Sequence, residues 1–372
     1  MSGGVETGRA LSGAVEFVQP GAAVSIQDLG RPGHRAIGVP LAGAADPVLM
    51  ACANALLVQA AKLAVLEVAL LGPVLQARAA AVRLALVGDF TPVLTAQGGR
   101  RVALSSWRSI TLQPGDQLAV GPCRSGVGYI ALAGGVGGEA VPLVLGSRST
   151  YARAALGGVA GRAPRVGDWL PCGPGAGVEL QAAAPFQHPV GPLRVLPGPQ
   201  DDHFDSAAWQ QFLGCAYSVT RDADRMGLRL QGPMLKHAGG RAGGRAGGQA
   251  DSGADIVSEA VVPGAIQVPG AGQPIVLGVD AQTIGGYAKI ATVISADVPR
   301  LAHARPGSVL RFAVVTRAQA LAARQAQTQA FARWLQGLAP VRASGVPDEA
   351  ALYASNLISG IIHASFPDDF AT

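Results

Sequence analysis

The chain has 372 residues, a formal net charge of +5 and only 14% charged residues. This length is enough for two domains with sizeable cores, and the basic residues are scattered arginines without interleaved aromatics, which argues against nucleic-acid binding. No uncharged apolar run is long enough to span a membrane and the first residues lack a signal-peptide pattern, so we expect a cytoplasmic protein.

Glycine and proline are abundant, at 51 and 26 residues, while aromatic residues make up only 5% of the chain. Frequent short strands joined by turns explain this composition better than long helices do. The sequence therefore predicts a mainly β protein with a few helices. The four cysteines are far apart and form no CxxC pair, which predicts reduced thiols and no metal site of the zinc type.

The first strands follow a short lead-in, residues 1–14, that we expect to be disordered. Residues 15–40 alternate apolar and polar positions between turn signals. Within them, residues 27–34 place two charges, an imidazole and two glycines in a loop. Either Asp28 and Arg31 pair and fix this turn, or Arg31 is presented to an anionic group, since a guanidinium suits carboxylate or phosphate geometry.

A helix is expected where the hydrophobic period changes, within residues 43–69. Asp46 followed by Pro47 is a helix-start signal, and apolar residues follow at helical spacing. Residues 60–70 predict a second helix that runs into a strand at 66–71. Glu67 lies inside this apolar run, so it is either paired, for instance with an arginine, or an acid–base group.

Residues 82–120 have the pattern of consecutive strands, with a hairpin signal at Gly98 and Gly99. The turn-and-strand outline of LQPGDQLAV returns at residues 165–172 and 304–315, which indicates two related halves. Between these repeats lies a dense polar loop, residues 146–151. Its hydroxyls and Arg148 either cradle an oxyanion, together with backbone N–H groups, or form an exposed turn.

The boundary between the halves is predicted in the segment 171–192, which is rich in proline, glycine and alanine. Beyond it, Asp201 and Asp202 either cap the helix expected over residues 206–212 or, with Gln200 and His203, bind a metal; we favour the caps. Residues 237–255 repeat Gly-Gly-Arg-Ala and have no apolar surface to bury. We therefore predict a disordered surface insertion there.

The stretch from residue 263 to residue 296 carries the densest set of polar groups between core strands. Strands are expected at 264–268, 274–279 and 290–294. A carboxylate, an amide, a hydroxyl, a phenol and an ammonium lie between the last two strands, with two glycines that permit close backbone approach. This segment is either a capped turn between strands or the rim of a binding site.

Two helices are expected near the C-terminal end of the chain. Residues 318–338 have an amphipathic pattern, and Asp348 is placed to cap a second helix over residues 348–364. This tail either packs on its own domain or makes an oligomer contact.

Seven motifs, in this order, resemble the family of the 5-oxoprolinase C subunit, whose members are also called KipA-like, allophanate hydrolase subunit 2 or biotin-dependent carboxyltransferase proteins. They are QPGAAVSIQDLGRPGHRAIGVP, GAADP, LGSRSTY, VLPGPQ, DRMGLRL, GAIQVPGAGQPIVLGVDAQTIGGYAKIA and RPGSVLRF. The resemblance implies two cyclophilin-like β-barrel modules. We place them at residues 15–185 and 190–320, the second with a glycine-rich insertion at 238–254 and followed by a helical tail at 321–372.

The resemblance implies more than one function. One branch of the family opens the lactam of 5-oxo-L-proline to L-glutamate with ATP, in a complex with proteins that resemble the A subunit and the KipI-like B subunit of 5-oxoprolinase. Another branch is similar to the carboxyltransferase domain of urea carboxylase. There, biotin would arrive on a partner chain, because no Met-Lys-Met biotin attachment site occurs here. A third resembles a regulatory protein that counters a kinase inhibitor. We expect the first function, an ATP-dependent hydrolase complex acting on a small cyclic amide.

The candidate site combines residue chemistry with these motifs. Asp280 and Tyr287 are suited to handling a proton and Lys289 to stabilising an oxyanion, so we predict these three as catalytic. Ala281 and Ile284 replace an arginine and a threonine that are typical of the family, which removes the polar groups found there. The predicted substrate-binding residues are Arg31, Arg148, Ser149, Thr150, Gln267, Gln282, Thr283, Gly285 and Gly286.

Overall fold

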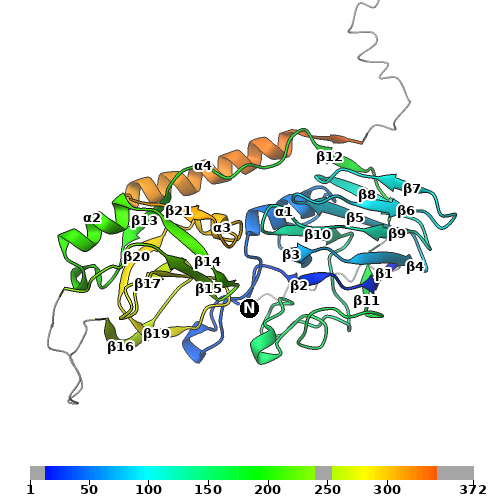
Figure 1. Ribbon diagram of the computed structural model, residues 1–372. Coiled ribbons are helices and arrows are strands. Elements are labelled where there is room, and N and C mark those ends of the chain that lie inside the picture. Colours follow the sequence, from blue (N-terminus) through cyan, green and yellow to red (C-terminus); the bar gives the residue numbers. More distant parts are fainter. Residues whose placement is uncertain (1–12, 174, 239–253, 342–372) are drawn as a thin grey trace, which may run out of the picture.

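The computed structural model describes residues 13–173, 175–238 and 254–341 (Figure 1). Within these ranges strands predominate and form two barrel-like groups, which we call the N-terminal half and the C-terminal half. The prediction of a mainly β protein with a few helices is confirmed. Apart from their edges, the predicted lead-in, the glycine-rich insertion and the second tail helix lie outside the described residues.

Two antiparallel sheets enclose the apolar core of the N-terminal half. The six-stranded sheet has the order β11 (Trp169–Cys172), β1 (Gly13–Gln19), β4 (Val74–Arg78), β9 (Gln117–Ala119), β6 (Val93–Thr95) and β7 (Arg101–Ala103). The seven-stranded sheet has the order β2 (Ala22–Gln27), β3 (Val65–Leu71), β10 (Gly128–Leu132), β5 (Val82–Val87), β8 (Arg108–Leu112), β12 (Leu180–Ala182) and β23 (Leu338–Pro340). Every residue of β5 and β10 is buried, including Arg83 within β5.

Helix α1 (Pro47–Ala55) covers the second face of the seven-stranded sheet. The Asp46 carboxylate accepts hydrogen bonds from two backbone N–H groups of the first turn, which confirms the predicted helix start. The helix predicted over residues 60–70 is wrong. The Asn54 side chain donates to two backbone carbonyls in residues 61–63 and holds a turn there, after which the chain enters β3.

One long sheet and a separate ribbon make up the C-terminal half. The eight-stranded sheet has the order β21 (Val309–Leu310), β14 (Tyr217–Asp224), β15 (Gly227–Gln231), β18 (Ile275–Leu277), β17 (Ala265–Gln267), β20 (Lys289–Val293), β13 (Leu193–Pro197) and β22 (Phe312–Val314). The ribbon pairs β16 (Asp255–Ala260) with β19 (Ile284–Tyr287). Part of the polar segment after β18 is thus a strand, because its backbone pairs with a segment that precedes it by about 25 residues.

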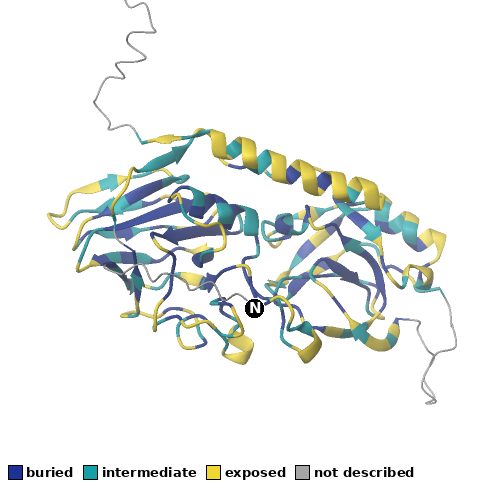
Figure 2. Cartoon of the chain, turned by 180° about the vertical axis from the view of Figure 1, so that it is seen from behind, coloured by how far each residue is buried: buried dark blue, intermediate teal, exposed yellow. Residues whose placement is uncertain are grey.

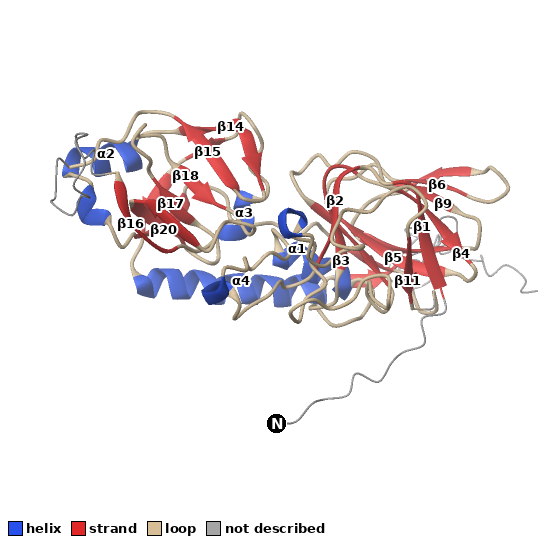
Figure 3. Cartoon of the chain, turned by 90° about the horizontal axis from the view of Figure 1, so that it is seen from below, coloured by secondary structure: helices blue, strands red, loops and turns tan. Residues whose placement is uncertain are grey.

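Two short helices accompany this sheet. Helix α2 (Ser206–Gly214) is capped by the Asp205 carboxylate, which accepts the N–H of Ala208, so the caps predicted at Asp201 and Asp202 are wrong. These two residues lie in a single turn just before the cap. Helix α3 (Val298–Leu301) lies with α1 between the two groups of strands (Figure 3).

Helix α4 (Arg317–Gln336) runs along both halves, with its outer face exposed (Figures 1 and 2). Its Gln327 side chain donates to the Ala296 carbonyl in the C-terminal half. Its Trp334 packs edge-on against Trp107 of the N-terminal half and donates to the Ala184 carbonyl. Strand β23 then joins the seven-stranded sheet beside β12. The first part of the tail therefore packs across both halves of its own chain.

No described helix is both long and apolar enough to cross a membrane. The four cysteines, all within the described ranges, are free thiols.

Two buried carboxylates and one partly buried arginine join the two halves. Arg225, at the end of β14, forms an ion pair with Glu67 of β3 and a two-fold pair with Asp280, at 2.9 and 3.0 Å. It also donates to the Gly43 carbonyl. Burial alone lowers the pKa of Arg225, but the charges of Glu67 and Asp280 outweigh burial and raise it. Glu67 is therefore paired with an arginine, one of the two alternatives that the sequence left open.

Replacing Arg225 by methionine should destabilise the fold strongly, because two buried carboxylates then lose their counter-charge. We expect a loss of about 3 kcal/mol in the free energy of unfolding, measured by urea denaturation. Arg229→Met, on the exposed face of the adjacent strand β15, is the matched control and should change stability by less than about 0.5 kcal/mol. Equal effects of the two substitutions would show that the interface charges do not stabilise the fold.

Candidate functional site

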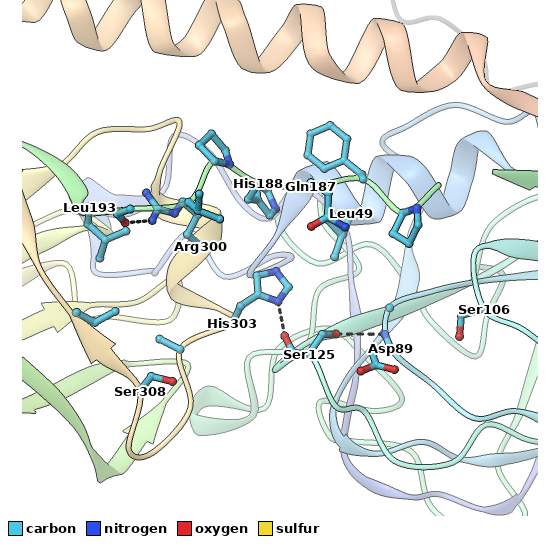
Figure 4. A pocket seen from close by; sticks show the side chains of 18 of the residues that line it. Leu49, Asp89, Ser106, Ser125, Gln187, His188, Leu193, Arg300, His303 and Ser308 are labelled. Atoms are coloured by element: carbon cyan, nitrogen blue, oxygen red, sulfur yellow. Dashed lines mark hydrogen bonds between the residues drawn. The ribbon is translucent and has the colours of Figure 1, made fainter. Parts of the chain in front are cut away.

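A cavity of about 880 Å³ lies between the two halves, below α4 in the view of Figure 4. Residues of the N-terminal half, of the C-terminal half and of the connecting segment 185–191 line it. Apolar walls come from Leu49, Phe90, Trp107 and Phe186, and polar side chains from Ser106, Ser125, Gln187, His188, Arg300, His303 and Ser308. An apolar cavity on which a few polar groups converge from separate segments is typical of a small-molecule site.

Two imidazoles of this cavity share one buried carboxylate. The Nε2 atoms of His188 and His303 lie 2.6 and 2.8 Å from Oδ2 of Asp46, whose side chain is fully buried. The centres of the two rings are 5.6 Å apart, and both residues line the cavity (Figure 4). Asp46, His188 and His303 thus form a compact cluster, although they come from three distant parts of the chain.

Neighbouring groups fix the orientation of this cluster. Because Oδ1 of Asp46 caps α1, only Oδ2 remains for the imidazoles. Nδ1 of His303 hydrogen-bonds to the Ser125 carbonyl. The backbone N–H of Asp46 donates to the Tyr129 hydroxyl, which in turn donates to Glu67 of the interface ion group. A chain of hydrogen bonds therefore connects the cluster to the charges that join the halves.

The surroundings favour the charged forms of Asp46 and His303. Burial alone raises the pKa of Asp46, but hydrogen bonds and charges from His188 and His303 outweigh it and lower the pKa to about 2. For His303, burial lowers the pKa while the bond to Asp46 raises it, and the net shift is upward. Burial and the charge of Glu67 raise the pKa of Tyr129 well above its ordinary value, so the phenol keeps its proton.

The predicted residues of loop 146–151 gather around Asp28. The Asp28 carboxylate accepts from the hydroxyls of Ser147 and Ser149, at 2.5 and 2.6 Å, and from the backbone N–H of Arg148, at 2.7 Å. The Thr150 hydroxyl accepts from a backbone N–H of β2. The hydroxyls of this loop are buried and bonded within the fold, so the loop is not an exposed turn.

The two arginines of this region bind backbone carbonyls. Arg31 is fully buried and donates to the carbonyls of Val144 and Ser149, at 3.0 and 2.5 Å. Burial lowers its pKa, although the charge of Asp28 opposes the shift. Its Nη1 atom has no hydrogen-bond partner among the described residues. The Arg148 guanidinium donates to the Val141 carbonyl.

A second polar cluster lies in the C-terminal half. Gln267 and Lys289 are cross-strand neighbours on β17 and β20, and both are almost fully buried. The Lys289 ammonium pairs with Glu259 of β16, which also accepts from Gln200. The amide nitrogen of Gln267 has no partner in the described part of the chain, and a Cβ atom added to Gly285 would lie 2.6 Å from it. These donors lie between the sheet and the β16–β19 ribbon.

The remaining predicted residues are spread along the segment between β18 and β20. Asp280 pairs with the interface arginine, and Tyr287 is 41% exposed on β19. Gln282 is exposed, and its backbone carbonyl accepts from an arginine of the N-terminal half. Thr283 is buried, and Gly286 lies in the ribbon. Within the described residues, none of the predicted catalytic or substrate-binding residues lines the cavity.

The sequence analysis missed the three residues of the cavity cluster as functional candidates. It identified Asp46 only as a helix cap, and it assigned no role to His188 or His303. These histidines are separated from Asp46 by 142 and 257 residues. The available signal was weak: one histidine in the connecting segment and another just after α3.

The comparisons with known proteins agree on one family. Residues 37–314 match the carboxyltransferase domain family, subdomain A and B. The chain is 33% identical over 324 residues to the C subunit of 5-oxoprolinase from Escherichia coli K12, covering 85% of this chain and 96% of that protein. It is 29% identical over 314 residues to urea amidolyase of Saccharomyces cerevisiae, covering 80% of this chain but 16% of that protein.

Solved structures show the same relationship. The crystal structure of Kluyveromyces lactis urea carboxylase superimposes with a TM-score of 0.75 at 28% sequence identity, over 86% of this chain and 29% of that chain. The urea amidolyase structure from K. lactis matches equally well and is covered over 20% of its length. The chain therefore spans only a fifth to a third of these large proteins, but nearly the whole of the E. coli 5-oxoprolinase C subunit.

Asp28→Ala should destabilise the N-terminal half, because two buried hydroxyls and two backbone N–H groups lose their acceptor. We expect a loss of about 2–3 kcal/mol in the free energy of unfolding, measured by urea denaturation. Asp89→Ala, at an exposed carboxylate of the same half, is the control and should be nearly neutral. If Asp28→Ala were as stable as the control, the loop would not depend on this carboxylate.

Proposed function

The chain belongs to the carboxyltransferase domain family, subdomain A and B, and from this membership we propose that it is the C subunit of a 5-oxoprolinase. Such a complex opens the lactam ring of 5-oxo-L-proline to give L-glutamate. The observation that carries the proposal is the match to the 5-oxoprolinase C subunit from E. coli, which extends over nearly that whole protein. A second protein of the same name, from Haemophilus influenzae, is 31% identical over 88% of its length.

The substrate is proposed to bind in the cavity between the halves. The cavity is large enough for a cyclic amide and presents several hydroxyl and imidazole groups to it. Arg194 and Arg300 share the single buried carboxylate of Asp297, at 2.6 and 3.2 Å. These two cations on one anion leave a net positive charge beside the cavity, which suits the carboxylate of 5-oxo-L-proline.

Gln267 and Lys289 mark a second candidate location. Their buried nitrogen donors are suited to a carbonyl oxygen or an oxyanion, and the missing side chain of Gly285 leaves room for the Gln267 amide. In this arrangement Lys289 would stabilise an oxyanion, while Tyr287 at the ribbon surface and Asp280 would handle a proton, as the sequence predicted. Variants of the two locations distinguish them.

The complete activity is assigned to a complex. ATP would activate the amide, and we propose that the chain acts in the cytoplasm with proteins that resemble the A subunit and the KipI-like B subunit of 5-oxoprolinase. Lactam hydrolysis by the isolated chain is not part of the proposal. The E. coli and H. influenzae relatives are named as subunits, which supports partner chains.

Carboxyl transfer from carboxybiotin to urea or a related amide is the alternative function. It is favoured by the family match itself and by the TM-score of 0.75 with K. lactis urea carboxylase. In this case biotin would be carried by a partner chain.

Coexpression with the proposed A-type and B-type partners decides between the two functions. ATP-dependent glutamate formation from 5-oxoproline that avidin does not inhibit supports the hydrolase. Avidin-sensitive activity on urea supports the carboxyltransferase alternative.

Arg300→Met, assayed in the reconstituted complex, should raise the KM for 5-oxoproline about tenfold or more with a smaller effect on kcat, because the substrate carboxylate loses a cation. Asp297 keeps Arg194, so the fold should be retained, and Arg300→Lys should restore part of the affinity. Arg333→Met, on the exposed face of α4, is the control. A normal KM for Arg300→Met together with loss of activity in Lys289→Met would instead place the substrate at the second location.

A further inference from the structure

The Asp46, His188 and His303 cluster has too many hydrogen-bond acceptors if its histidines are neutral. The Ser125 carbonyl can only accept, so Nδ1 of His303 carries a proton. In a neutral ring Nε2 is then a lone pair, yet it lies 2.8 Å from a carboxylate oxygen, which also only accepts. A positive species must lie between these two atoms. It is either a second proton on the ring or a metal ion.

His188 points to the same position. Its Nε2 atom lies 2.6 Å from the same Oδ2 of Asp46, and its Nδ1 atom is buried without a hydrogen-bond partner in the described chain. Protonating both rings would place two positive charges on rings whose centres are 5.6 Å apart, and a neutral His188 that donates from Nε2 would still leave His303 charged. One divalent ion would supply the positive charge to both Nε2 atoms and to the carboxylate oxygen at a single point. The ligand atoms of the three residues all lie within 4.8 Å of one another.

We propose that Asp46, His188 and His303 bind a divalent transition-metal ion of the zinc class at the wall of the cavity. Two imidazole nitrogens and one carboxylate oxygen are a ligand set typical of catalytic zinc, which uses three protein ligands and leaves a fourth position open. Magnesium and calcium prefer oxygen ligands and do not suit two imidazoles. Binding of the ion does not depend on the proposed function. Only the role of the ion toward a substrate rests on the proposed function.

The surroundings match those of a metal site. Ligating histidines almost always donate their other ring N–H to a carbonyl or carboxylate, as His303 does to Ser125. Asp46 is fixed on both sides, since Oδ1 caps α1 and its backbone N–H donates to Tyr129. Metal–ligand distances of about 2.0–2.2 Å place neighbouring ligand atoms about 3.3 Å apart. The present 2.6 and 2.8 Å would each have to open by about half an ångström or slightly more to admit the ion.

The open position of such an ion faces the cavity, because both histidines line it. There the ion could take a water molecule or the carbonyl oxygen of an amide, and act on it as a Lewis acid. This role is the part of the inference that depends on the cavity being the substrate site.

Metal binding is tested on the full-length chain without substrate. The protein is freed of metal with a chelator and titrated calorimetrically with Zn²⁺, and separately with Co²⁺ while the visible spectrum is recorded. We expect one ion per chain with a dissociation constant in the micromolar range or below, visible bands from Co²⁺ bound to nitrogen and oxygen, and a higher melting temperature with Zn²⁺.

His188→Gln, His303→Gln and Asp46→Asn should each weaken Zn²⁺ binding about 100-fold and abolish the Co²⁺ bands. Asp46→Asn keeps an oxygen for the helix cap, so it separates ligand loss from unfolding. His34→Gln, outside the cluster, is the control and should bind as the wild type does. Absence of saturable binding, or binding unchanged in the three variants, would overturn the metal site and leave protons between these groups. A chain that binds Zn²⁺ while its complex fails to hydrolyse 5-oxoproline keeps the metal site and refutes the function.

Discussion

The pairing of Arg225 with Glu67 and Asp280 is the interaction on which the arrangement of the two halves depends. A guanidinium that is largely removed from water between two barrels is costly unless its charge is neutralised, and here one carboxylate comes from each half. Because Glu67 also accepts from Tyr129, which receives the backbone N–H of Asp46, the same group determines where the cavity cluster lies. Displacing the halves would therefore break the interface charges and the cavity together.

Helix α4 is a second restraint on the arrangement of the two halves. Helix α4 bonds to the C-terminal half through Gln327 and to the N-terminal half through Trp334, and β23 then completes a sheet of the N-terminal half. The cavity lies below this helix, between the two halves that it connects (Figure 4). A ligand bound there contacts both halves without requiring them to move, which suits a site that is formed before the ligand arrives.

Local signals in the sequence predicted much of the fold. Asp46 with Pro47 marked the start of α1, and the pattern over residues 82–120 predicted consecutive strands, which include β5 and β8. The errors occurred where a distant partner decides the local structure. Residues 284–287 form β19 only because β16 pairs with them, and residues 61–63 form a turn because Asn54 binds their carbonyls. Hydrophobic period carries no information about such partners.

The candidate site was harder to predict for the same reason. Dense polar loops such as residues 146–151 are easy to recognise in a sequence. In the structure, however, the hydroxyls of Ser147 and Ser149 donate to Asp28 and have no spare donor for a ligand. The cavity cluster is the opposite case. Its members are separated by more than a hundred residues, and two of their nitrogen atoms face one oxygen. Some side chains are brought together by the fold while their polar atoms lack hydrogen-bond partners. Such a group is a stronger indication of a ligand than a dense polar loop, because burying unsatisfied polar atoms costs stability that a bound ion or molecule restores.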